Sequence, residues 1–297
     1  MFAIHEIEME NQRSVFPRLF YFLAKQVSDA CGRGGEGAVR EAVRSFAAER
    51  GKKLRQEHRA AGLKQNVKSY QLASDTLVDT RRREKYLALN EEVCLKEVYT
   101  CPYAGIWLQY GGWEIGKWYC EEMEKARFEA YTNGAGQMHL SQMLTEERNN
   151  HCRFSMYYRE ANISPEEAKE SFTENKHAPA DTAEIDEHFY LSDGNICLML
   201  YYKMYAAAVS HFGGTGRCAV AEGLKRFSDD AVATMRSQAK RTLHPFNAGF
   251  AGKNFPLPLE LSALPEAFDA NQTEANALLE KHMLSRIRRE LDTSDMN

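Results

Sequence analysis

Cys152-Arg-Phe-Ser-Met-Tyr-Tyr-Arg159 alternates apolar and polar side chains along its whole length. Strict alternation is typical of a β-strand that buries one face and exposes the other. The runs 93–99 and 137–144 have similar strand-like spacing. The region 90–160 is therefore predicted to contain a small antiparallel sheet together with helices.

Helical spacing of apolar residues dominates the rest of the chain. It predicts helices over 15–30, 38–54, 103–110, 113–131 and 273–291. The polar stretch 64–89 is also predicted to be mostly helical, and its run Arg81-Arg82-Arg83 is interpreted as a solvated face. The polar stretch Glu174–Asp186 is predicted to be a linker.

The chain also contains an internal sequence repeat, here called the internal echo, in which matching residues lie 181 positions apart. Nine residues between Leu200 and Asn247 match residues between Leu19 and Asn66 without a gap, among them Gly213, Gly216 and Phe227. This pattern predicts an α+β fold in which helical hairpins pack on a small antiparallel sheet, with a second helical hairpin that arose by internal duplication. The predicted domains are 1–162, an α+β domain, and 163–297, a mainly helical region containing the repeat.

Charge, apolar runs and cysteine content indicate which kinds of partner and which cellular compartment to expect. The chain has 38 Lys+Arg and 42 Asp+Glu, a net charge of −4, which is typical of neither nucleic-acid binding nor disorder. The longest apolar run, Ile196–Phe212, is interrupted by Lys203 and His211 and falls short of the ~20 residues of a membrane span. The opening residues lack a signal-peptide pattern, and the seven cysteines are odd in number and form no CxxC pair. We therefore expect a cytoplasmic protein with reduced thiols.

The residues whose side chains can react or bind a ligand are concentrated in one part of the sequence. In order they are Glu49-Arg50-Gly51, Val98-Tyr-Thr-Cys101-Pro102, Trp107, Gly116, Tyr119-Cys120, Glu124, Leu144-Thr145 and Cys152-Arg-Phe154. Their order and spacing resemble the L-2-amino-thiazoline-4-carboxylic acid hydrolase family over about residues 15–160. There is also a distant similarity to 4-vinyl reductase-type ligand-binding domains. The chain departs from the family pattern at Glu124, where the family usually has Asp, and at Glu147–His151, where it tends to have Gly-Asp.

The family resemblance implies a hydrolase that opens a small cyclic amidine or amide carrying a carboxylate, at a non-peptide C–N bond. Such a reaction needs a base, an acid and a cation for the carboxylate. The predicted catalytic residues are Glu121, Glu124, His151, Cys120 and Cys152, and the predicted substrate-binding residues are Arg50, Cys101, Tyr103, Trp107 and Tyr119. Acid/base catalysis by the Glu121/Glu124 pair with His151 is favoured over a nucleophilic cysteine, because no cation lies beside Cys120 in the sequence.

Several alternatives stay open from the sequence alone. The cysteines and aromatic residues can be ordinary core residues, and Arg50 can form a salt bridge with a buried Glu from a neighbouring helix. A cysteine–histidine zinc site matches no known ligand spacing, so no metal and no cofactor are predicted. A non-catalytic small-molecule binder or sensor, or an enzyme for a different small substrate, are the alternative functions. The expected partner is a small-molecule substrate, not nucleic acid or membrane, and the unpaired apolar helices allow a homodimer.

Overall fold

The computed structural model describes residues 2–76, 79–173, 191–264 and 272–292. The chain divides into two compact units, one formed by Met1–Ala42 with Ser192–Asn297 and the other by Val43–Leu191. The division runs through one long helix, α3 (Gly35–Ala60). The predicted domain boundary at residue 162 lies inside the second unit.

The first unit is built from helices in its described part. Its elements are α1 (Phe2–Arg13), α2 (Val15–Cys31), η1 (Gly32–Gly34), the start of α3, α8 (Asp193–Thr242), α9 (Ala248–Asn254), η5 (Leu261–Ala263), α10 (Thr273–Leu279), η7 (Glu280–Leu284) and α11 (Ser285–Asp292). Helices α2 and α8 approach so closely that a Cβ at Gly223 would lie 3.0 Å from Cα of Leu23. Their apolar stripes, which include Phe20, Leu224 and Phe227, form the core of this unit.

Two positions of the internal echo have matching local geometry. Gly32 ends α2 with φ 59° and ψ −140°, and Gly213 interrupts α8 with φ 53° and ψ −124°. Asn66 and Asn247 each begin a short helix, and the Oδ1 of each accepts a hydrogen bond of 3.0 Å from the backbone N–H three residues on. These matches agree with the predicted duplication, which itself stays a prediction.

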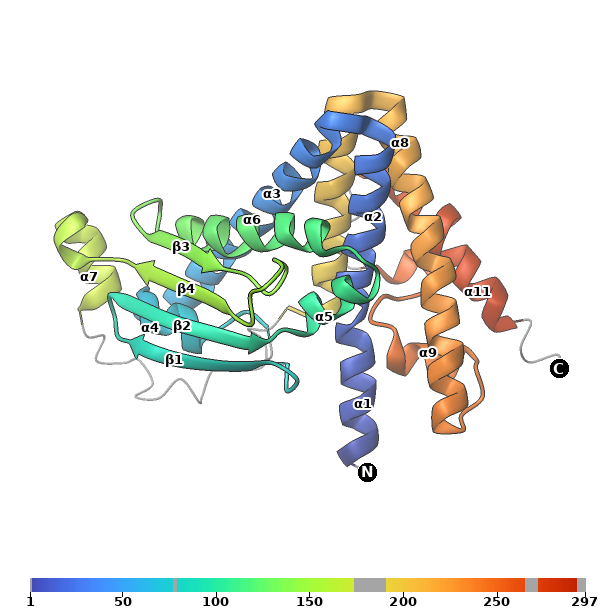
Figure 1. Cartoon of the computed structure of the whole chain (residues 1–297), viewed down its shortest axis with the longest axis horizontal. Coiled ribbons are helices and arrows are strands. Elements are labelled where there is room, and N and C mark those ends of the chain that lie inside the picture. The colour runs from blue at the N-terminus through green and yellow to red at the C-terminus, as the bar shows by residue number, and fades with distance from the viewer. Residues whose placement is uncertain (1, 77–78, 174–190, 265–271, 293–297) are drawn as a thin grey trace. The chain divides into compact units, whose positions relative to one another are not determined.

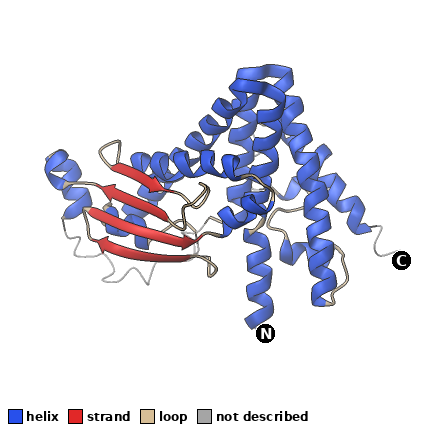
Figure 2. Ribbon diagram, in the orientation of Figure 1, coloured by secondary structure: helices blue, strands red, loops and turns tan. Residues whose placement is uncertain are grey.

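The second unit contains the sheet, whose strand order is β1-β2-β4-β3 with every pair antiparallel (Figure 2). Its strands are β1 (Arg83–Leu89), β2 (Val93–Thr100), β3 (Gln137–Gln142) and β4 (Cys152–Tyr157). Its other elements are the rest of α3, α4 (Val67–Leu72), α5 (Pro102–Gln109), α6 (Trp113–Tyr131), η2 (Glu160–Asn162) and α7 (Pro165–Phe172). The predicted α+β class and the three predicted strands are confirmed.

The prediction of a mostly helical stretch over 64–89 is wrong in its second half. Only α4 is helical there, and Arg83–Leu89 forms the edge strand β1. Consecutive charged residues interrupt the alternation of apolar and polar side chains that would identify a strand. An edge strand with little buried surface does not need that alternation. The predicted linker Glu174–Asp186 lies outside the described residues.

One face of the sheet is covered and the other is largely exposed. Cys94, Lys96 and Val98 of β2 pair with Met156, Phe154 and Cys152 of β4, and this row is buried. The core beneath it comes from α3, α4 and α6, and α4 lies partly hidden behind the strands in Figure 1. Arg153 and Tyr99 lie on the opposite, exposed face. The covered face is therefore where charged groups can be held away from bulk water.

Among the helices that the structure describes, none combines the length and the apolar character needed to cross a membrane.

Candidate functional site

A buried carboxylate joins two arginines beneath the sheet. Asp75, in the loop after α4, accepts hydrogen bonds from Arg50 of α3 through Nε at 2.9 Å and Nη2 at 2.7 Å. Arg127 of α6 donates to the same carboxylate through Nη2. Burial opposes the charge on Asp75, but the two arginines outweigh it and hold its pKa far below the usual range. The three side chains are thus a permanently charged network that fixes α3 and α6 to this loop.

Arg50 was predicted to bind the carboxylate of a substrate. In the structure its side chain is 7% exposed and two of its nitrogens are bound to Asp75. Its position on the inward stripe of α3 is as expected, and the alternative of a buried acidic partner is the arrangement found. The partner is an aspartate from a loop and not a glutamate from a neighbouring helix.

Glu124 is the predicted acid/base residue that lies within this charged region. It is half-buried on α6, and the hydroxyl of Tyr70 donates to its Oε2 at 3.1 Å. Burial raises the pKa of Glu124, but Arg127, Lys96 and Arg82 lower it more, so the net shift is downward. Glu124 is therefore an ionised carboxylate that can accept a proton.

Two further cations, Lys96 and Arg82, approach Glu124 from the sheet side. Lys96 projects from the covered face of β2 and donates from Nζ to Oε1 of Gln71 at 2.7 Å, with Glu84 at 3.8 Å. Burial and the neighbouring Arg82 lower the pKa of Lys96. Arg82 donates from Nε to Glu84 at 2.8 Å, and its side chain is 29% exposed. The region around Glu124 thus combines anions with an excess of cations.

The three predicted cysteines lie near one another although they come from different parts of the chain. Cys101 precedes α5, Cys120 is on α6, and Cys152 begins β4, where its Sγ accepts a hydrogen bond from the N–H of Leu144 at 3.2 Å. Burial, followed by the proximity of Cys101 and Cys152, raises the pKa of Cys120 well above its ordinary value. Burial likewise raises the pKa of Cys152. At neutral pH Cys120 and Cys152 are therefore thiols and poor nucleophiles.

The predicted aromatic residues form a compact cluster. Ring centroids of Trp107 and Tyr119 are 5.3 Å apart, and Tyr103 lies 6.0 Å from Trp107 and 6.4 Å from Tyr119. A Cβ at Gly116 would lie 2.5 Å from the Trp107 ring, so only glycine permits this packing. Trp107 is fully buried, whereas Tyr103 is half-buried. Trp107 is therefore a core residue, and Tyr103 is the member of the cluster with accessible surface.

His151 lies apart from Glu124. Its Nδ1 is 2.6 Å from Oδ1 of Asn150, its Nε2 is 3.6 Å from Glu97, and its ring is 5.8 Å from that of Tyr99. No hydrogen bond or ion pair joins it to Glu124 in the part of the chain that the structure describes. Glu97 and Tyr99 lie on the face of β2 opposite Lys96, and the predicted pairing of His151 with Glu124 is not seen. Glu121 is half-exposed, with Lys117 at 3.8 Å.

A comparison with protein families identifies a relationship for the stretch that contains these residues. Residues 12–156 match the model of the L-2-amino-thiazoline-4-carboxylic acid hydrolase family. Over these residues the chain is similar to that family, and the stretch is called the hydrolase-family segment. No curated protein and no solved structure matches the chain.

The hydrolase-family segment includes every predicted site residue, from Arg50 to Cys152. It ends at Met156 within β4, so both the charged region and the cysteines fall inside it. The described residues contain no group of three or more His, Cys, Asp or Glu side chains placed to hold a metal ion.

Sequence reasoning missed four members of the charged region in this hydrolase-family segment: Tyr70, Asp75, Lys96 and Arg127. Lys96 is at an inward position of the alternating strand Cys94-Leu-Lys-Glu-Val98, and that alternation was a usable signal. Arg127 lies on the inward face of α6, four residues after Met123. Asp75 is in a polar loop that no local pattern distinguishes, so only the folded chain reveals it.

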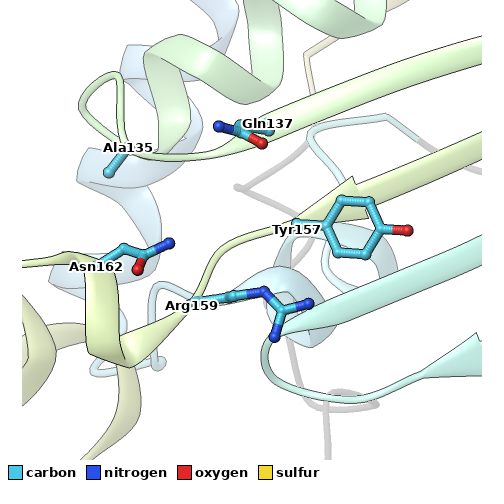
Figure 3. A pocket seen from close by; sticks show the side chains of 5 residues that line it. All are labelled: Ala135, Gln137, Tyr157, Arg159 and Asn162. Carbon is cyan, nitrogen blue, oxygen red and sulfur yellow. The ribbon is translucent and has the colours of Figure 1, made fainter.

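A separate small cavity opens at the other end of β4 (Figure 3). It has a volume of about 240 Å³ and is lined by Ala135, Gln137, Tyr157, Arg159 and Asn162. The guanidinium of Arg159 lies 5.6 Å from the centre of the Tyr157 ring. None of the predicted site residues lines this cavity, so it is distinct from the charged region around Glu124.

Proposed function

We propose that the protein hydrolyses a non-peptide C–N bond in a small cyclic amidine or amide that carries a carboxylate, such as L-2-amino-thiazoline-4-carboxylate. The observation that carries the proposal is Glu124, an ionised and half-buried carboxylate among cations within the hydrolase-family segment. Because this carboxylate is ionised at neutral pH, it is in the protonation state that can accept a proton from water.

Glu124 is the group that moves protons in this proposal. It takes a proton from water as the oxygen bonds to the amidine carbon, and it returns that proton to the ring nitrogen. A second transfer through the same carboxylate moves the hydroxyl proton to the nitrogen as the C–N bond breaks. Burial raises the pKa of Tyr70 well above its ordinary value, so its hydroxyl stays protonated and keeps Glu124 oriented.

Arg50 has a positioning role here. Through Asp75 it holds Arg127, and Arg127 is one of the cations that keep Glu124 ionised. His151 is left outside the reaction because it contacts Asn150 and Glu97. Cys120 and Cys152 border the site as thiols, so the proposal needs no covalent intermediate.

The test is a turnover assay with the full chain. Purified protein is incubated with L-2-amino-thiazoline-4-carboxylate and, separately, with lactams and hydantoins that carry a carboxylate, and the gain of one water is followed by mass spectrometry. The proposal expects one of these rings to be opened at a rate proportional to protein concentration. Saturable binding without any ring opening would contradict it and favour a small-molecule binder.

A further inference from the structure

The cations around Glu124 are not equally available to a ligand. Arg127 binds Asp75 and is 7% exposed, and it also donates to Ser74. The side chain of Lys96 is 8% exposed and binds Gln71. These two cations face partners that the protein itself supplies, and they have little surface left for a substrate.

Arg82 differs from them in exposure and in its free donors. Its side chain is 29% exposed, and its Nε is bound to Glu84. Within the described residues, no hydrogen bond is made by its two terminal nitrogens, Nη1 and Nη2. A guanidinium fixed through Nε while its terminal nitrogens are free has the geometry for binding a carboxylate with two parallel hydrogen bonds.

The position of Arg82 also suits a substrate at Glu124. Its charge acts on Glu124 and on Cys101, so it lies near the proposed base and near the residue that precedes α5. It follows Arg81, which is itself bound to Asp79 through Nε and Nη2, and this pair anchors the backbone just before β1. Arg82 is thus a cation held in place by the fold and open to solvent on one side.

We propose that Arg82, and not Arg50, binds the carboxylate of the substrate through Nη1 and Nη2. This inference rests on the proposed function for the nature of the substrate. It assigns a role to the basic run 81–83, which the sequence pattern alone indicated to be a solvated face. It also makes the site selective for anionic rings over otherwise identical neutral ones.

The experiment compares two ligands with three proteins by isothermal titration calorimetry. The ligands are L-2-amino-thiazoline-4-carboxylate and 2-aminothiazoline, which lacks the carboxylate. The proteins are wild type, Arg82→Met and Arg83→Met, the last a matched control because Arg83 is an exposed arginine next in the chain. Arg82→Met should weaken binding of the carboxylate ligand by about 10- to 100-fold and leave the carboxylate-free ligand within about two-fold. Arg83→Met should change neither.

Arg82→Lys provides a second readout if the methionine variant folds poorly. It keeps the charge but loses the two-pronged geometry, so it should raise KM about ten-fold with little change in kcat. The inference on Arg82 is overturned if Arg82→Met weakens both ligands equally, or if wild type binds both equally well. Binding that depends on Arg82 without ring opening would overturn the proposed function and leave the inference standing. Ring opening that does not depend on Arg82 would overturn the inference on Arg82 and leave the proposed function standing. Failure to bind either ligand would overturn the inference and the proposed function together.

Discussion

Burial gives His58 a different charge state from the one that its position near a helix end would favour. It lies near the end of α3, where a charged histidine would favour the helix dipole. Instead it is fully buried, with Nδ1 2.6 Å from the Tyr131 hydroxyl and Nε2 2.8 Å from the carbonyl of Ala73. Burial lowers its pKa to about 4, so the folded protein holds it neutral.

This shift predicts a loss of stability in mild acid. Below pH 6.5 the unfolded chain protonates His58 while the folded chain does not, so the free energy of unfolding falls as pH drops from 6.5 to about 4. The loss from this residue should reach roughly 3 kcal/mol. Urea unfolding of His58→Gln between pH 7 and pH 4 should show a flatter pH dependence than wild type. The exposed His139 provides the control, and an equally flat curve for His139→Gln would contradict the assignment.

The thiols give a second prediction at the residue scale. Cys218 is exposed, whereas burial raises the pKa of Cys120 and of Cys152. Iodoacetamide at pH 7.5, followed by peptide mass spectrometry, should therefore label Cys218 well before Cys120 or Cys152. Cys120→Ser and Cys152→Ser should each keep kcat within a few-fold of wild type. Faster labelling of Cys120 than of Cys218 would reveal a reactive thiolate and bring back the nucleophilic-cysteine alternative.

At the scale of elements, α6 does most to build the site. Cys120, Glu124 and Arg127 are spaced four and three residues apart, which places them on one face of the helix. The face is set against α3 at Gly51, where an added Cβ would lie 2.1 Å from the carbonyl oxygen of Arg127. The distance between these helices therefore depends on a residue without a side chain.

Gly51→Ala should lower the free energy of unfolding by about 1–3 kcal/mol, because backbone has to move to admit the methyl group. Gly37→Ala is the matched control on the same helix, since an added Cβ there meets nothing within 4 Å. It should be neutral or stabilising by up to about 1 kcal/mol. Chemical denaturation of both variants checks the prediction, and equal effects would show that the close contact does not matter.

The sequence predicted the elements well where one periodicity was clear. The helix 113–131 has the bounds expected, and β4 buries the alternate residues that its pattern indicated. Strand β1 was missed because its charged residues lie on an exposed edge, where no burial imposes alternation. For the candidate site, helix position and family resemblance predicted Glu124, and that role stays a prediction. Asp75 was not predicted, because it contacts residues of α3 and α6 that lie far away in the sequence.

At the scale of the whole molecule, the family match covers residues 12–156 and leaves the C-terminal helices without an assigned role. The paired glycines Gly32 and Gly213 and the paired caps Asn66 and Asn247 fit a duplicated hairpin. In the second copy Ala231 takes the place of Arg50, and it has no charge to hold an aspartate. We therefore expect a single chemical site in each chain.

The central claim is that Glu124 is the base for ring opening, and the most direct test is kcat for L-2-amino-thiazoline-4-carboxylate in two variants. Glu124→Gln keeps an acceptor for the Tyr70 hydroxyl but removes the base, and Glu129→Gln makes the same change at an exposed position of α6. We predict that Glu124→Gln lowers kcat by about 100-fold or more, while Glu129→Gln stays within about two-fold of wild type. A folded Glu124→Gln protein with the kcat of wild type would contradict the account.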